Sequence, residues 1–145
     1  MDNQRDVGYK CTREDFRPAI MHPVRWLDWE QDLEMARELW GMEPEPFRGM
    51  WNEAREQGYQ YCAVIEEGKI IARAAVWRYS DTAWELAAVF VREDHQRRGY
   101  GKSVCSFATA AILDAGRTAT CHTRATNLAM HCTAQSIGFK PVLTL

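Results

Sequence analysis

The apolar residues in the first part of the chain recur at helical spacing. Trp29, Leu33, Ala36 and Trp40 occupy positions i, i+4, i+7 and i+11, which places them on one face of a helix. Asp28 is a residue type that caps helices, so the helix is predicted to begin there and to run to about residue 40. Its apolar face is expected to pack into a core.

Two prolines mark the next segment. Pro44 and Pro46 disfavour a helix interior, because proline lacks a backbone N–H and its ring clashes with the preceding turn. A loop is therefore expected over residues 41–47, and a second helix is predicted over 47–57.

Beyond residue 58 strand-like and helical segments alternate, separated by turn residues. The predicted elements are strands over 59–65, 69–79 and 83–91, a helix over 101–115, a strand over 118–124, a helix over 127–137 and a strand over 139–145. A further short strand is allowed near residues 9–12. This order predicts a mixed α/β sheet with an antiparallel half.

Composition narrows the class of protein. A chain of 145 residues with a net charge of −2 is expected to form one domain and not to coat nucleic acid. No apolar run is long enough to span a membrane, and residues 1–10 lack the apolar centre of a secretory leader. The five cysteines are scattered, which is typical of free thiols, so a cytoplasmic location is expected.

The stretch HQRRGYGKS, residues 95–103, combines glycines and cations at the predicted start of a helix. A P-loop needs a glycine where Gln96 stands, and a dinucleotide-binding fingerprint needs one where Val104 stands. Both nucleotide interpretations therefore fail. Unpaired N–H groups at a helix start still suit a pyrophosphate, while a solvated basic turn explains the same residues without a ligand.

With its flanks, this stretch resembles motif A of the GNAT superfamily of acyl-CoA-dependent N-acetyltransferases. The motif reads Gln96-Arg97-Arg98-Gly99-Tyr100-Gly101, and Asn127 followed by Gly138-Phe139 is similar to the family's later signature. The likeness covers residues 59–145, which would form the acetyl-CoA-binding core, with acceptor-side helices in residues 1–57. It implies a GNAT fold: a mostly antiparallel sheet with helices on both faces, splayed between the family's fourth and fifth strands.

The resemblance also implies where acetyl-CoA is bound. Backbone groups of the strand residues Val89, Phe90 and Val91 would pair with the pantetheine arm, and the Val89 N–H would polarise the thioester carbonyl. Asn127 would bond the same arm. The pyrophosphate would be held by the amides and cations of Gln96, Arg97, Arg98, Gly99, Tyr100, Gly101 and Lys102.

For proton transfer, the sequence offers one candidate base and lacks the acid that many family members use. Glu85 precedes Gln96 by the spacing of the general-base glutamate in the histone-acetylating branch of the superfamily, although a strand glutamate is as often a salt-bridged structural residue. Ala134 replaces the tyrosine with which many members protonate the departing thiolate. A direct acetyl transfer to a primary amine is the leading hypothesis. A non-catalytic acyl-CoA-binding or regulatory domain is the alternative.

Other features point less clearly to a function. The pair Cys121-His122 suggests a zinc site, but strand neighbours face opposite sides of a sheet, so no metal is expected. Glu43 and Glu45 stand where the family often binds its acceptor, or form a solvated acidic turn. The short tail after Phe139 suggests that the family's usual final strand is either missing or completed by a partner chain, and the second case would form a homodimer. The identity of the amine cannot be read from these residues.

Overall fold

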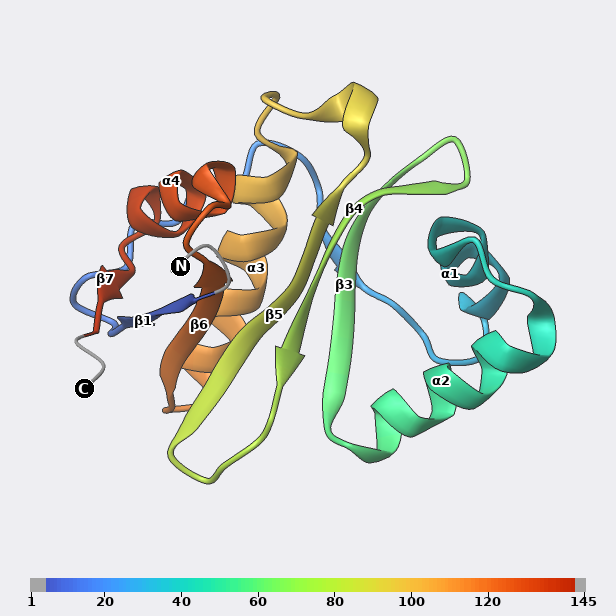
Figure 1. Ribbon diagram of the computed structural model, residues 1–145, viewed down its shortest axis with the longest axis horizontal. Coiled ribbons are helices and arrows are strands. Elements are labelled where there is room, and N and C mark those ends of the chain that lie inside the picture. Colours follow the sequence, from blue (N-terminus) through green and yellow to red (C-terminus); the bar gives the residue numbers. More distant parts are fainter. Residues whose placement is uncertain (1–4, 143–145) are drawn as a thin grey trace.

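The structure, a computed structural model that describes residues 5–142, is built on one seven-stranded sheet (Figure 1). The strand order is β2-β3-β4-β5-β6-β1-β7, and every neighbouring pair is antiparallel except β5 and β6, which are parallel. This arrangement confirms the predicted mixed α/β class. The strands are β1 (Asp6–Cys11), β2 (Arg25–Trp26), β3 (Tyr59–Glu66), β4 (Lys69–Trp77), β5 (Ala83–Val91), β6 (Thr118–Arg124) and β7 (Lys140–Pro141).

Helices cover both faces of the sheet, as the GNAT resemblance implies. Figure 1 shows α3 behind the central strands with α4 beside it, and α1 and α2 on the other side. Each layer encloses its own apolar cluster, one formed by the sheet with α3 and α4 and one formed by the sheet with α1 and α2. The helices are α1 (Leu33–Trp40), α2 (Pro44–Glu56), α3 (Tyr100–Asp114) and α4 (Leu128–Ser136). None of the helices within residues 5–142 has the length and apolar character needed to cross a membrane.

The loop predicted over residues 41–47 is wrong. Helix α2 begins at Pro44, and Pro46 lies in its first turn. Proline is tolerated there because the N–H groups of a first helical turn have no partner within the helix. The prolines therefore mark the start of this helix and do not exclude it.

Helix α1 begins later than predicted. The carboxylate of Asp28 accepts hydrogen bonds from the N–H groups of Glu30 and Gln31, so it closes a turn that precedes the helix. Regular helix starts at Leu33, after Asp32. The expected packing of the apolar face is confirmed: Leu33 and Ala36 are buried, and Trp40 packs against the same cluster.

The two ends of the described chain meet at one side of the sheet. Strand β1 pairs with β6 along its whole length, and Tyr9 lies opposite Cys121. The last predicted strand is shorter than expected: β7 comprises Lys140–Pro141 and pairs with β1, while residues 143–145 lie outside the described part. Because β1 of the same chain is the neighbour of β6, no partner strand is needed there. The homodimer stays a prediction without that support.

Candidate active site

Strand β5 carries a bulge at its centre. Ala87 lies opposite Ala75 of β4 and Phe90 opposite Arg73, so Ala88 and Val89 together face one residue of β4. Ala88 has a φ of 54°, a left-handed conformation that is rare outside glycine. The Nε–H of Arg73 donates to the Ala88 carbonyl oxygen at 3.0 Å, which holds the bulge in place. A bulge of this kind ends regular pairing and redirects the strand.

Strands β5 and β6 separate next to this bulge. Their pairing covers Ala83–Glu85 opposite Thr118–Thr120 and then stops. Beyond it lies a cavity of about 350 Å³ between the strands. The walls of this cavity, here called the β5–β6 gap, are formed by Asp6, Leu86, Ala87, Ala88, Val89, Cys121, His122, Thr123, Arg124, Asn127 and Met130. The gap corresponds to the splay that the resemblance implies.

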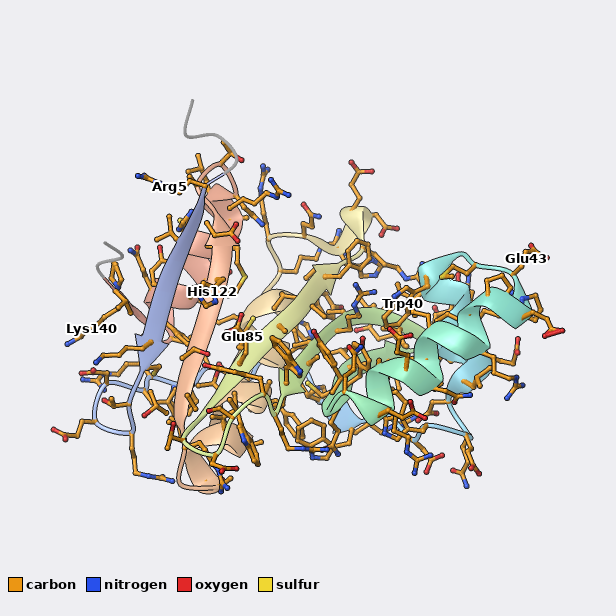
Figure 2. The ribbon with its side chains drawn as sticks, turned by 60° about the horizontal axis from the view of Figure 1, so that its bottom comes forward. Arg5, Trp40, Glu43, Glu85, His122 and Lys140 are labelled. Carbon is orange, nitrogen blue, oxygen red and sulfur yellow. The ribbon has the colours of Figure 1, made fainter. Side chains whose placement is uncertain are left out.

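Glu85 occupies the point at which the strands separate. Its carboxylate is held by two residues of β6: Nδ1 of His122 lies 3.0 Å from Oε2, and the Thr120 hydroxyl donates to Oε1 at 2.8 Å. The Glu85 side chain is 14% exposed, whereas that of His122 is 53% exposed. Figure 2 shows the two side chains close together on neighbouring strands. A largely buried carboxylate thus contacts solvent through an exposed imidazole.

The loop between β5 and α3 presents a row of unpaired backbone donors. Within residues 5–142, no hydrogen bond is made by the N–H groups of residues 97–102. These groups lie at the start of α3, a helix of 15 residues, where the helix dipole favours an anion. Gln96, Arg97 and Arg98 are exposed, and Arg97 has a φ of 66°. The predicted phosphate-binding residues therefore do come together in one loop.

One of the two glycines of this loop is explained by the protein's own packing. A Cβ on Gly99, whose φ is 85°, would lie 1.9 Å from Cε of Met21. A Cβ on Gly101 would lie 3.4 Å from a methyl group of Val91, which is an ordinary van der Waals contact. Packing within the protein therefore accounts for Gly99 and does not require a glycine at position 101. The loop is also fixed by Ser103, whose hydroxyl accepts from the Met21 and His22 N–H groups.

The side chain of Tyr100 has a structural role. The ring is 6% exposed and stacks on His22, with 3.7 Å between centroids. Its hydroxyl donates to Oε2 of Glu66 at 2.6 Å, and this contact raises the pKa of the phenol. Only the backbone N–H of Tyr100 remains for a phosphate. Lys102 is half-buried in the same first turn.

Of the three strand residues predicted to hold a pantetheine arm, Val89 lines the gap. The Val91 side chain contacts α3, and Phe90 is 42% exposed on the opposite face. Asn127 also lines the gap, and its Oδ1 accepts from the Met130 N–H at 3.2 Å, which caps α4. Its amide nitrogen makes no hydrogen bond with the described residues, so it is the group left for a ligand.

Helix α4 offers no hydroxyl where many GNAT enzymes have a tyrosine. Ala134 is fully buried, and its carbonyl oxygen accepts from the Phe139 N–H at 2.9 Å. Cys132 on the same helix is exposed. His131 is held by its two ring nitrogens, one at the Tyr9 hydroxyl and one at the Arg124 carbonyl oxygen.

The cysteine in the wall of the gap is not a nucleophile at neutral pH. Cys121 is buried, and burial followed by the nearby Glu85 raises the pKa of its thiol to about 12. A thiol attacks as its thiolate, which is scarce at neutral pH at such a pKa. Cys121 faces the core and His122 faces solvent, as strand alternation predicts. Residues 5–142 contain no cluster of three metal-binding side chains.

The acidic residues Glu43 and Glu45 lie at the start of α2, where carboxylates complement the helix dipole. Figure 2 shows Glu43 at the far side of the molecule from Glu85 and His122. This position fits the solvated acidic turn.

Two residues at the candidate site were not predicted from the sequence. His122 contacts Glu85, and Arg73 bonds the bulge at Ala88. Both contacts depend on which strands are neighbours.

The sequence comparisons agree with this geometry. The family model described as the acetyltransferase (GNAT) family matches residues 21–139. No curated protein matches the chain significantly.

Solved structures share the fold at low sequence identity. An acetyltransferase from the GNAT family of Colwellia psychrerythraea superposes with a TM-score of 0.74 and 17% identity, covering 94% of this chain and 52% of that one. A protein assigned to the GNAT family from Novosphingobium aromaticivorans superposes with a TM-score of 0.73 and 22% identity. The match covers 94% of this chain and 59% of that one. The present chain thus spans a little over half the length of these two relatives.

A shorter structure matches over nearly its whole length. AAC(6')-Iy, in complex with the bisubstrate analogue CoA-S-monomethyl-acetylneamine, has a TM-score of 0.68 and 17% identity. The match covers 85% of this chain and 93% of that one.

Proposed function

Because the chain belongs to the GNAT acetyltransferase family, we propose that it transfers an acetyl group from acetyl-CoA directly to a primary amine. The observation that carries this proposal is the β5–β6 gap, which opens beside the Ala88 bulge just beyond Glu85, the last paired residue, and whose wall residue His122 contacts the Glu85 carboxylate. An open gap between two strands offers a polar arm unpaired backbone groups on either side. The same gap brings a carboxylate close to the place of reaction.

The cosubstrate would be held at two places. The amides of residues 97–102 would take the pyrophosphate, with Gln96, Arg97, Arg98 and Lys102 around it. Backbone groups of β5 from Val89 to Val91, and the free amide nitrogen of Asn127, would take the pantetheine arm. The N–H of Val89, the second residue of the bulge, is assigned to the thioester carbonyl, where it stabilises the negative charge that develops on the oxygen.

Glu85 is assigned the role of proton acceptor. An aliphatic amine has a pKa of about 10 and arrives protonated, so it must lose a proton before it attacks. The contacts with Thr120 and His122 fix the Glu85 carboxylate, and the exposed His122 gives the proton a route to solvent.

Direct transfer is favoured over a covalent intermediate on the protein. Cys121 is the cysteine in the gap wall, and its thiol is protonated at neutral pH. A thiolate leaving group with a pKa of about 8.5 departs near neutral pH without a strong acid, so Ala134 does not prevent turnover. Water is available to protonate it.

A variant that fills the gap tests this proposal. Thr123 is 6% exposed and lines the gap, so Thr123→Trp should block it, whereas Thr123→Val keeps the volume and provides the control. Release of CoA thiol from acetyl-CoA in the presence of an amine panel should be lost in the first variant and kept in the second. Equal rates in both variants would place the reaction elsewhere. Tight binding of acetyl-CoA without acetylation of any amine would support the alternative, a non-catalytic acyl-CoA-binding domain.

A further inference from the structure

Arg73 lies at the centre of the sheet, on the face covered by α1 and α2. Its guanidinium carbon is 4.0 Å from the centroid of the Trp40 ring and 5.3 Å from that of Phe90. The Nε–H is used by the carbonyl oxygen of Ala88 at the bulge. The two terminal nitrogens make no hydrogen bond with any described residue, so the broad end of the guanidinium is available to a ligand.

No carboxylate of residues 5–142 neutralises Arg73. Another arginine on this side, Arg92, is already paired with Glu38 at 2.5 Å and donates to the Ile70 carbonyl oxygen. Glu85 is paired with His122. Burial lowers the pKa of Arg73, yet an arginine stays charged in proteins. A half-buried, unpaired cation is costly, and a bound anion removes that cost.

Arg73 and Glu85 lie on the same face of the sheet. Glu85 and Ala87 are two residues apart in β5, so their side chains point to the same face of the sheet. Ala87 and Ala88 both pack against the apolar cluster to which Trp40 belongs. Glu85 and Ala88 are three residues apart, about 10 Å along a strand. In Figure 2, Trp40 lies on the α1 side of Glu85 and His122. The bulge thus has a proton acceptor on one side and a cation on the other.

We propose that the acceptor amine carries a carboxylate, as an amino acid does, and that Arg73 binds this carboxylate between the rings of Trp40 and Phe90. This inference rests on the proposed function, because it names the substrate class of the same site. A guanidinium with two free terminal nitrogens matches the two oxygens of a carboxylate. The aromatic rings fix the guanidinium plane and shield it from water. A polycationic amine would be repelled by the same group.

The test is binding to the CoA-bound protein, measured by calorimetry with matched pairs of amines. Each pair consists of an amino acid with a free carboxylate and the same compound as its carboxamide. The carboxylate form should bind about 10- to 100-fold more tightly. Arg73→Met should remove this preference, and Arg73→Lys should keep part of it. Arg78→Met is the matched control, because Arg78 also stacks on a tryptophan and bonds a polar side chain but lies away from the bulge.

The outcomes separate this inference from the proposed function. Preferential binding of the carboxylate form that depends on Arg73 supports the inference, even if no amine becomes acetylated and the proposed function fails. Acetylation without any preference between the two forms overturns the inference and leaves the proposed function intact. If the Arg73→Met protein does not fold, the preference of the unmodified protein decides, and equal or undetectable binding of both forms overturns the inference. A purely structural Arg73 predicts that Arg73→Met weakens both members of a pair equally.

Discussion

Nδ1 of His122 lies 3.0 Å from Oε2 of Glu85, which joins β6 to β5 at the last residue of their pairing. The pair connects a carboxylate that is 14% exposed to an imidazole that is 53% exposed. A buried carboxylate with a solvent-facing partner is well suited to accept a proton and pass it on.

Glu85→Gln should slow acetyl transfer to an aliphatic amine by roughly 10²-fold or more, because the variant cannot accept the proton. An aromatic amine arrives without this proton, so its acetylation should change far less. Glu67→Gln, a change in the exposed turn between β3 and β4, is the control. Steady-state rates with both kinds of amine measure the difference. Equal losses with the two amines would mean that Glu85 has only a structural role.

Gly138→Ala should destabilise the fold by about 2 kcal/mol or more, because the site combines a left-handed backbone with a backbone clash. The residue has a φ of 110°, and a Cβ there would lie 2.1 Å from the carbonyl oxygen of Asp15. Gly116→Ala is the matched control, since its φ is 80° but nothing lies within 4 Å of the added atom. Urea unfolding of both variants separates the two contributions. A similar loss in both would show that the segment around Asp15 can move aside.

Asp32→Asn should destabilise the protein at neutral pH and reduce its sensitivity to acid. The Asp32 carboxylate is 6% exposed and accepts hydrogen bonds from Arg25 and from the Asp28 N–H. The bond from Arg25 lowers the pKa of Asp32 below its ordinary 3.8. The ionised form is favoured in the folded protein, so the stabilisation is complete above pH 3.8 and is lost as the pH falls through the lower folded value.

Breaking the Arg25–Asp32 pair should lower the free energy of unfolding by about 2 kcal/mol at neutral pH, which is within the range for hydrogen bonds to charged groups. Thermal unfolding at several pH values measures both effects. Asp114→Asn, at a side chain 73% exposed, should change little. An unchanged acid profile in Asp32→Asn would contradict the assigned role.

Cys132 should be the cysteine that reacts rapidly with an alkylating reagent in the folded protein. It is exposed, whereas Cys11, Cys62, Cys105 and Cys121 are buried. Burial raises the pKa of the Cys11 thiol to about 11 and that of Cys62 to about 12, so their thiolates are scarce at neutral pH. Intact mass should show one fast addition, absent in Cys132→Ser. Several fast additions would mean that the core opens readily.

Local spacing predicted the features that lie within one segment. The loop and helix start at residues 96–101 were predicted correctly, because a glycine-containing turn before a helix is a local signal, and the binding of a phosphate there stays a prediction. The apolar face of α1 was found in the same way. By contrast, the start of α2 was mispredicted because the two prolines were judged as interior residues, although their place in the first turn makes them favourable.

Features that depend on distant pairing could not be read in advance. His122 contacts Glu85 only because β5 and β6 are parallel neighbours, although the two residues lie 37 positions apart in the sequence. Arg73 reaches Ala88 because of a bulge, which sequence periodicity does not reveal. The place of β1 between β6 and β7 likewise depends on contacts between the two ends of the described chain.

Acetyl transfer itself is the most direct test of the central claim. The protein is incubated with acetyl-CoA and a panel of amines and peptides, and mass spectrometry and a thiol assay quantify acetylated amine and released CoA. We predict equal amounts of both products with at least one amine, and none of either with Thr123→Trp. Release of CoA without acetylated amine, or binding of acetyl-CoA with no product at all, would contradict the claim.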